Sequence, residues 1–190
     1  ITSTPLVIGQ IVPYAGEYGI SKDPESFAVY GYRKYFTDRS RGAVLRLSRD
    51  GMTEISSYGM HDFFRDELAT ATKIVGGWNS HTKDYILSIQ TGADYKTATF
   101  DEGVLGWTSF SSYKPSHIFS LSNVFYTFNQ DADINSNLGR LYQHYLGPYA
   151  KFYGVTYGSD VTIVLNSNPS VVKNFKTINY EGGPGWELES

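Results

Sequence analysis

Oxygen-bearing side chains alternate along the polar stretch 129–138, at Asp131, Asp133, Asn135 and Asn137. This spacing could supply the ligands of a calcium loop, because hard cations prefer oxygen ligands that a turn brings together. Two features of such a loop are missing: Ser136 stands where glycine is needed, and Tyr142 stands where a bidentate glutamate is expected. A solvated hairpin loop explains the stretch more simply. We therefore expect no metal and no other cofactor, while calcium binding by the Asp131–Asn137 loop stays open.

Candidate acid–base residues are found mainly in expected turns. Asp101 and Glu102 follow an expected strand, and Asp38 and Asp50 lie in turns. A glycosidase would need two such carboxyl groups roughly 5 or 9 Å apart, but aspartate is common in turns because its side chain bonds to nearby backbone. No histidines are paired at metal-ligand spacing, and no nucleophile, phosphate-loop or zinc-protease motif is present. We therefore expect no enzymatic activity.

Positive charges gather between residues 33 and 49 of an otherwise acidic chain, at Arg33, Lys34, Arg39, Arg41, Arg46 and Arg49. Arginine makes planar, bidentate contacts with carboxylates, which favours an electrostatic docking face between subunits. A solvated hairpin edge that blocks unwanted strand pairing is the alternative interpretation. The residues that we predict for an interface are Arg33, Arg39, Arg41, Arg46, Trp107, Tyr126, Tyr142 and Phe175.

The composition is that of a globular, aromatic-rich chain, with 41% hydrophobic residues, 16 Tyr and 11 Phe. A formal net charge of −3 argues against a nucleic-acid partner held by phosphate contacts. The absence of cysteine excludes a disulfide framework, and no apolar run approaches the ~18 residues of a membrane span. Aromatic residues in this proportion suit pleated sheets and contacts between subunits.

The elements that must position these residues are short β-strands. Two units, 27–56 and 98–145, repeat a pattern of aromatic and β-branched runs separated by Gly, Asp and Asn. Propeller blades are laid down in this way at roughly 40–50 residues each, and a closed propeller needs about four or more blades. The 190 residues hold fewer. We predict a mainly β fold of propeller-like or sandwich units, an incomplete blade array, with two short amphipathic helices.

Local signals place turns and helices within that frame. Hairpins are predicted at Gly31-Tyr32 and Asp50-Gly51, and a strand pair, Tyr149–Tyr157 with Val161–Leu165, around Gly158. Residues 59–72 have the apolar spacing of a helix. A second helix is predicted after Asn168-Pro169, since Asn caps a helix and Pro suits its first position.

Three regions follow from these elements. Residues 1–25 would be an N-terminal strand and loop, residues 26–166 a β-rich propeller-like region with the helix at 59–72, and residues 167–190 a C-terminal helix and closing strand. The chain begins without Met. We expect a processed product or part of a longer polypeptide.

Two long runs resemble a known class of sequence: GYRKYFTDRSRGAVLRLSRDGMTEIS with the following MHDFF, and GWTSFSSYKPSHIFSLSNVFYTFNQ continued by LYQHY, FYGVTYGSDVTIVLNSNPSVVKNFKTINYEG and GWE. They are similar to virion structural proteins of tailed bacteriophages, in particular tail, tail-tip and muzzle-type proteins of crAss-like or marine phages, near the C-terminus of such proteins. The resemblance covers residues 27–187 and contains no catalytic signature. It implies a multi-copy component of the virion tail.

The leading hypothesis is a structural component of a phage tail. It would assemble through β-rich and aromatic contacts with other tail proteins, with copies of itself and with the remainder of a processed precursor, without nucleic acid or a membrane segment. The alternative is a receptor- or glycan-binding module at the tail tip, motivated by Trp107, Tyr126 and the 129–138 loop. A propeller-type glycan-cleaving enzyme is the least favoured hypothesis.

Overall fold

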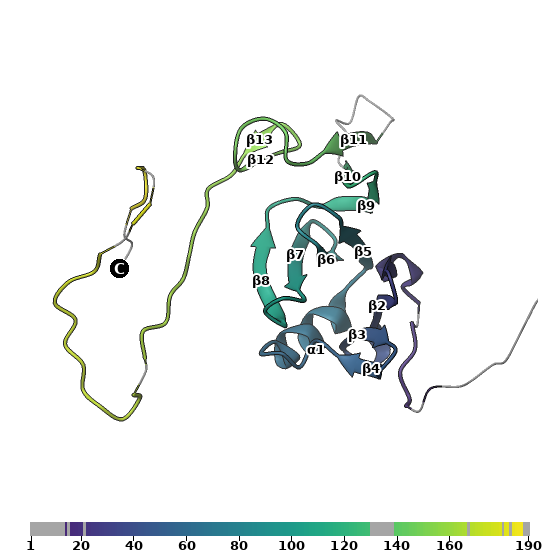
Figure 1. Ribbon diagram of the computed structural model, residues 1–190, viewed down its shortest axis with the longest axis horizontal. Helices are drawn as coiled ribbons and strands as arrows, with labels where there is room; N and C mark the ends of the chain where they lie inside the picture. The colour runs from purple at the N-terminus through teal and green to yellow at the C-terminus, as the bar shows by residue number, and fades with distance from the viewer. Residues whose placement is uncertain are drawn as a thin grey trace, which may run out of the picture. The chain divides into compact units, whose positions relative to one another are not determined.

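The computed structural model describes residues 14, 16–20, 22–129, 139–166, 168–179, 181–182 and 184–187. The chain divides into two compact units, Ile1–Gly158 and Ser159–Ser190. Every helix and strand of the described residues lies in the first unit (Figure 1). No helix among them is long and apolar enough to cross a membrane. The strand expected within residues 1–12 and the calcium-type loop at 131–137 lie outside the described residues.

The first sheet is a four-stranded antiparallel meander made of β1 (Ala28–Tyr30), β2 (Arg33–Asp38), β3 (Ala43–Ser48) and β4 (Gly51–Glu54). Both predicted hairpins are confirmed, since Tyr30 pairs with Arg33 and Ser48 pairs with Gly51. The second turn falls one residue earlier than its Asp-Gly signal, because Gly51 already pairs as the first residue of β4.

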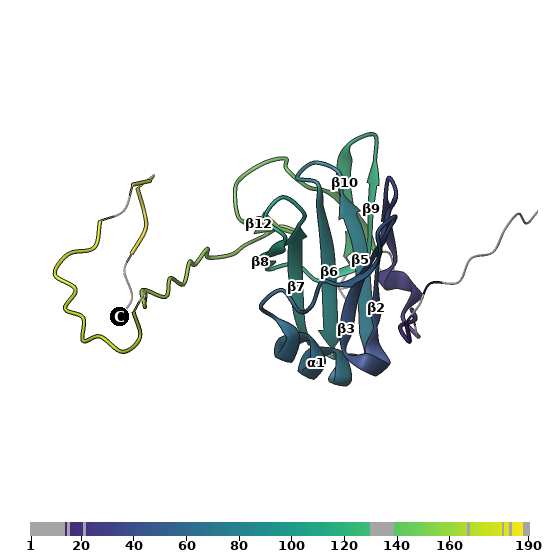
Figure 2. The same cartoon turned by 60° about the horizontal axis from the view of Figure 1, so that its bottom comes forward.

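The second sheet is the middle layer of the first unit. It is also an antiparallel meander, with strands β5 (Lys73–Asn79), β6 (Asp84–Thr91), β7 (Asp94–Asp101) and β8 (Gly106–Ser111). Successive side chains of a strand point to opposite faces, and β6 is buried on both faces. Figure 2 shows β6 between its neighbours β5 and β7. Tyr85 and Phe100 enter a core shared with the first sheet, while Val75 and Ile86 enter a second core on the other face.

Stacked aromatic rings join the first sheet to the second. The ring of Tyr35 on β2 stacks on Trp78 of β5 at 5.5 Å and on Tyr85 of β6 at 4.9 Å between ring centroids. Tyr35 and Tyr85 are fully buried, so these offset contacts add to the burial of apolar ring surface. The Tyr85 hydroxyl donates to the carbonyl oxygen of Ser26, at the end of the short 3-10 helix η1 (Pro24–Ser26), over 2.7 Å.

Two adjacent glycines let β5 lie between two layers. A Cβ at Gly76 would lie 2.2 Å from the Ser26 carbonyl oxygen, on the side of η1. A Cβ at Gly77 would lie 2.2 Å from Cγ2 of Ile118, on the side of β9 (Pro115–Leu121). The backbone of β5 therefore lies closer to η1 and β9 than it could if either glycine carried a side chain.

Helix α1 (His61–Thr70) closes one end of the first core and confirms the helix predicted at 59–72. Phe64 and Leu68, one turn apart, are fully buried, and the Phe64 ring lies 4.4 Å from the Trp107 ring between centroids. Its opposite face is charged, and Arg65 pairs with Asp62 at 2.7 Å. The apolar spacing that predicted the helix is therefore the spacing of its buried face.

The third sheet lies against β5 and has the order β11-β10-β9, with β10 (Val124–Asn129) between β9 and β11 (Arg140–Gln143). The Ser120 hydroxyl on β9 donates to the Trp78 carbonyl oxygen at 2.7 Å and accepts from the Ser80 amide at 3.1 Å. Ile118 and Phe125 fill the second core from this side. The middle sheet is thus packed on both faces, and the third sheet covers the β5 part of one of them.

A small hairpin of β12 (Lys151–Phe152) and β13 (Val155–Thr156) corrects one predicted strand pair. The chain turns back at Tyr153 and Gly154, whose φ angles are 53° and 88°, and not around Gly158. Two consecutive residues at positive φ make the tight turn that suits the twist of a hairpin. Residues 161–165 are left without a strand partner.

The C-terminal segment, residues 159–187, contains no helix or strand among its described residues. The second predicted helix is therefore wrong: the structure has a turn at 168–171 followed by irregular backbone. Asn168 and Pro169 are good starting residues, but Val171, Val172 and Ile178 are poor helix formers, and a helix this short needs packing for its stability. The apolar residues that would have packed are exposed, with Val172 at 98% and Phe175 at 60%.

The described residues thus form a mainly β protein with several antiparallel sheets and one α-helix. The mainly β prediction is confirmed. Within the described part of the chain the sheets are open and layered, and they form no closed barrel or propeller.

Candidate functional site

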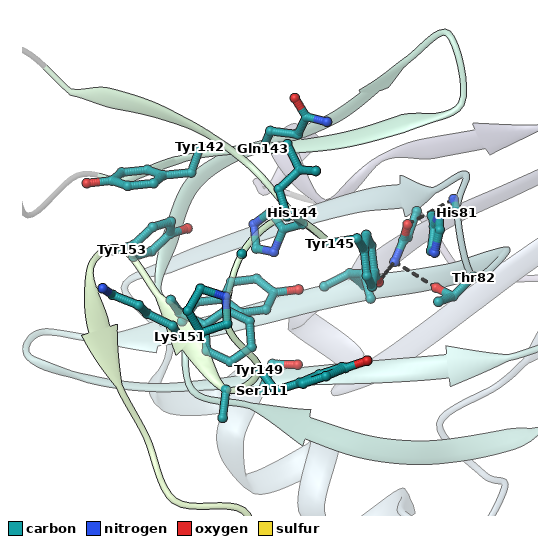
Figure 3. A pocket seen from close by; sticks show the side chains of 18 of the residues that line it. His81, Thr82, Ser111, Tyr142, Gln143, His144, Tyr145, Tyr149, Lys151 and Tyr153 are labelled. Atoms are coloured by element: carbon teal, nitrogen blue, oxygen red, sulfur yellow. Dashed lines mark hydrogen bonds between the residues drawn. The ribbon is translucent and has the colours of Figure 1, made fainter.

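A cleft of about 840 Å³ opens on the middle sheet of the first unit. Its floor comes from β6, β7 and β8, one wall from the turn between β5 and β6, and the other wall from residues 142–154. We call it the aromatic cleft, because Tyr142, Tyr145, Tyr149 and Tyr153 line it together with His81 and His144 (Figure 3). Its volume is within the range of small-molecule sites.

The floor exists because the third sheet leaves the β7–β8 side of the middle sheet uncovered. Thr99, Ser109 and Ser111 present small hydroxyl side chains to the cleft from these two strands. On the buried part of the same face, the Thr97 hydroxyl bonds to Ser88 and to the Tyr113 carbonyl oxygen at 2.7 Å. The β7–β8 part of this face is therefore polar: Thr97 is hydrogen-bonded inside the fold, and Thr99, Ser109 and Ser111 line the cleft.

The wall formed by residues 142–154 departs from ordinary backbone geometry. Tyr145, Ala150 and Tyr153 have φ angles of 63°, 53° and 53°, a region that non-glycine residues seldom occupy. Such residues cost free energy and persist where the surrounding structure holds them. The contacts of this wall with the rest of the first unit must therefore provide that compensation.

Tyr145 is fixed to the opposite wall by two contacts. Its ring stacks on His81 with 4.1 Å between centroids and 24° between planes. The Asn79 side-chain amide donates to the Tyr145 hydroxyl at 2.5 Å and to Thr82 at 2.7 Å. Figure 3 shows these contacts between the two walls at one end of the cleft. Tyr145 remains 54% exposed despite them.

His144 connects the same wall to the second core. Its Nε2 lies 2.7 Å from the Thr127 hydroxyl, which lies 2.8 Å from the Tyr153 hydroxyl. Burial among Tyr113, Phe125 and Phe152 lowers the pKa of the His144 imidazole to about 4, and burial raises the pKa of Tyr153 to about 12. At neutral pH the ring is uncharged, so Tyr153 can donate to Thr127 and Thr127 to His144.

Acidification should weaken the fold through His144. The unfolded imidazole binds a proton near its ordinary pKa of 6.5, whereas the folded one binds it near 4. Between these values the unfolded state holds more protons, so stability is lost as pH falls from about 6.5 to 4, by up to roughly 3 kcal/mol. Urea unfolding at several pH values will measure this loss. His144→Gln, which cannot titrate, should lose less stability over the same range, and an identical pH dependence in the variant would contradict the assignment.

Two of the carboxylates considered for catalysis, Asp101 and Asp38, have structural partners. The Asp101 carboxylate accepts from the amides of Gly103 (2.5 Å) and Val104 (3.3 Å) in the β7–β8 turn. Asp38 accepts from the Arg41 amide and from its guanidinium, each at 3.3 Å. Within the described ranges, no group of three or more His, Asp or Glu residues could hold a metal ion.

The predicted arginine surface is partly engaged within the chain. Arg46 donates to Glu102 at 2.7 Å, and Arg33 lies 3.7 Å from the same carboxylate. Arg39 pairs with Asp23 at 3.9 Å and also donates to the Ala71 carbonyl oxygen, while Arg41 pairs with Asp38. The structure therefore distributes the four arginines among several internal partners, and their role at an interface stays a prediction.

The four aromatic residues predicted for an interface lie in different environments. Trp107 packs against the first core and donates its indole N–H to the Ile55 carbonyl oxygen at 3.0 Å. Tyr126 stacks on Phe119 at 5.5 Å between centroids, and Tyr142 lines the aromatic cleft. Phe175 is exposed in the C-terminal segment. Only Tyr142 of this predicted set lines the cleft.

Sequence reasoning missed most of the cleft, including His81, Tyr145 and Tyr149. One signal was available, the run LYQHYLGPYAKFYG at 141–154, where aromatic residues alternate with Gly and Pro. That composition marks an aromatic loop, but it does not show which surface the loop covers.

Comparison with protein families finds that part of this chain is similar to structural proteins of the phage virion tail. More specifically, residues 147–188 match the family model described as the Crassvirus muzzle protein C-terminal domain. The match covers less than a quarter of the chain, including part of the cleft wall and the C-terminal segment. It confirms the predicted resemblance to muzzle-type tail proteins of crAss-like phages and the predicted location in the virion tail. A comparison with curated proteins found no match.

Proposed function

We propose that this chain is an assembling subunit of the phage tail, and that its C-terminal segment packs against neighbouring subunits. The observation that carries the proposal is the apolar surface of this segment within the region that matches the muzzle domain. The proposal assigns the chain no enzymatic activity. Its partners are copies of itself, other tail proteins and the remainder of any longer polypeptide.

The exposed apolar side chains of the segment are too many for a stable free surface. They are Val161, Ile163, Val164, Leu165, Val171, Val172, Phe175, Ile178 and Trp186, each at least 48% exposed. Burying one such side chain fully is worth about 1.5–3 kcal/mol, and large contiguous apolar patches mark interaction sites. A neighbouring subunit that covered even part of the segment would therefore gain substantial binding free energy.

The run VTIVL at 161–165 suits pairing with a sheet edge. It is rich in β-branched residues, and Val161, Ile163 and Leu165 alternate as on one face of a strand. An extended segment of this kind can add a strand to an exposed edge of a neighbouring subunit. Repetition of that contact around the tail axis would multiply it by the symmetry of the assembly.

A propeller-like arrangement belongs to the same proposal. The sheets β1–β4 and β5–β8 each have the four-stranded, up-and-down order of a propeller blade. Blades from several chains, placed around the tail axis, would complete the array that one chain leaves open.

Solution mass will test the self-association part of the proposal. The 190-residue chain should give a molar mass above 21.3 kDa that rises with concentration in light scattering. Val161→Ser, Ile163→Ser and Val164→Ser together should return it to monomer mass, since these changes remove apolar surface and leave the first core intact.

The matched control places three serines on the first unit, at the exposed positions Val104, Leu121 and Leu141. It should associate like the natural sequence, and thermal unfolding on the same samples will show whether all three proteins are folded. A folded chain that stays monomeric at every concentration would count against self-association. Loss of association in the control alone would place the contact on the first unit.

A receptor- or glycan-binding module at the tail tip is the second candidate function. The aromatic cleft favours it, because a concave site with exposed rings is a feature of binding modules and is not needed for packing between subunits.

A further inference from the structure

We infer that the aromatic cleft binds a neutral oligosaccharide. Sugar rings present apolar C–H faces and hydroxyl edges, so their sites combine exposed aromatic faces with small polar groups. The cleft has both, with Tyr145 and Tyr149 on one wall and Ser109 and Ser111 on the floor.

Tyr149 supplies the most accessible ring. Its side chain is fully exposed, although it belongs to the wall that lines the cleft. A tyrosine in this position buries little of itself in the fold and can cover a ligand at low conformational-entropy cost, because only two side-chain torsions must be fixed. Its aromatic face is therefore available for stacking.

Tyr145 supplies a ring that is already held in place. The stack on His81 and the hydrogen bond from Asn79 fix its orientation, and the left-handed backbone at Tyr145 fixes its direction from the chain. Fixing a contact residue before binding reduces the entropy lost on binding. The cleft thus pairs one pre-positioned ring with one free ring.

The floor supplies unused hydrogen-bonding groups. Among the described residues, the side chains of Ser109 and Gln143 have no hydrogen-bond partner, and both are exposed at the cleft. Hydroxyl and amide groups can each donate and accept, as sugar hydroxyls do. These groups would fix the orientation of a sugar that the tyrosines hold by stacking.

The lining favours a saccharide over an apolar peptide. Ile86 and Leu146 are its only large aliphatic residues among the described ones, and small hydroxyl side chains occupy the floor where an apolar segment would need aliphatic contacts. Lys151 is the single basic side chain other than histidine among the described lining residues, which provides no cluster for an acidic polymer.

A glycan array of neutral and acidic oligosaccharides, probed with the 190-residue chain, will test the inference. We expect binding to neutral oligosaccharides, and calorimetric titration with the strongest of them should show saturable binding. Tyr149→Ala should weaken that binding by about tenfold or more, since it removes a stacking face. The fold should survive, because Tyr149 is fully exposed.

The matched control is Tyr32→Ala, at a 68% exposed tyrosine in the β1–β2 turn that does not line the cleft. It should bind like the natural sequence. A second variant, Ser109→Val, should also weaken binding, because it removes a floor hydroxyl at an exposed position.

Three results would overturn the inference: no binding across the array, binding to acidic glycans alone, or equal affinity of Tyr149→Ala and the natural chain. A synthetic peptide of residues 159–179 will be titrated in parallel. If this peptide binds and Tyr149→Ala abolishes its binding, the cleft is an assembly site for a neighbouring subunit and not a saccharide site.

Discussion

Gly76→Ala should destabilise the first unit by about 3 kcal/mol, at the upper end of the cost of overpacking a core. The added Cβ would lie 2.2 Å from the Ser26 carbonyl oxygen and 2.6 Å from the Tyr85 hydroxyl. These two atoms form the hydrogen bond that joins η1 to the middle sheet. Backbone atoms move only with their whole segment, so the methyl group must displace η1 or break this bond.

Thermal and urea unfolding of the variant will measure the loss. Gly19→Ala is the matched control, because a Cβ at Gly19 meets nothing within 4 Å and its φ is not in the left-handed region. The control should unfold within about 0.5 kcal/mol of the natural chain. Equal stability of the two variants would show that η1 does not lie against β5 in solution.

Glu102→Ala should lower the free energy of unfolding by about 3 kcal/mol, because it removes a charge that two buried groups need. Glu102 lies in the β7–β8 turn with its side chain only 9% exposed, and it accepts from the Tyr35 hydroxyl at 2.6 Å and from Arg46 at 2.7 Å. Burial and this hydrogen bond both raise the pKa of Tyr35. Removing the carboxylate leaves a mostly buried guanidinium and a buried hydroxyl without their acceptor, which costs more than the intact pair contributes.

A double-mutant cycle will separate the pair from its surroundings. Arg46→Met alone should also destabilise, since Glu102 would then keep only Tyr35 and the more distant Arg33. The double variant Glu102→Ala with Arg46→Met should be more stable than the sum of the two losses predicts. Strictly additive losses would show that the two side chains do not interact in solution.

The sequence predicted those parts of the fold that depend on neighbouring residues. The hairpin at Asp50-Gly51 and the helix at 59–72 are visible in local spacing, because turn chemistry and a buried helical face repeat over a few residues. The prediction of a second helix was wrong because it relied on local signals alone. Its capping residues were suitable, but helix formation also needed a packing surface, and the described part of the chain leaves Phe175 60% exposed.

The candidate site could not be predicted, because it is built from contacts distant in sequence. Asn79, for example, contacts Tyr145, which is 66 residues further along the chain. The left-handed backbone at Tyr145 and Tyr153 has no signal in their residue type. The arginine cluster suggested a docking face for the same reason. Its partner Glu102 lies 56 residues from Arg46, so the sequence did not show that these charges are paired within the chain.

The border of the matched domain has a consequence for how such proteins diversify. The match begins at residue 147, inside the wall that lines the aromatic cleft, whereas the first compact unit ends at Gly158. Phages that recombined at this border would exchange Tyr149, Phe152 and Tyr153 together with the C-terminal segment that we propose for tail assembly, while Thr99 and Ser109 remained from the recipient. Inheritance of that segment and of part of the cleft wall would then be linked, and a graft would succeed only where the incoming aromatic wall fits the recipient sheet.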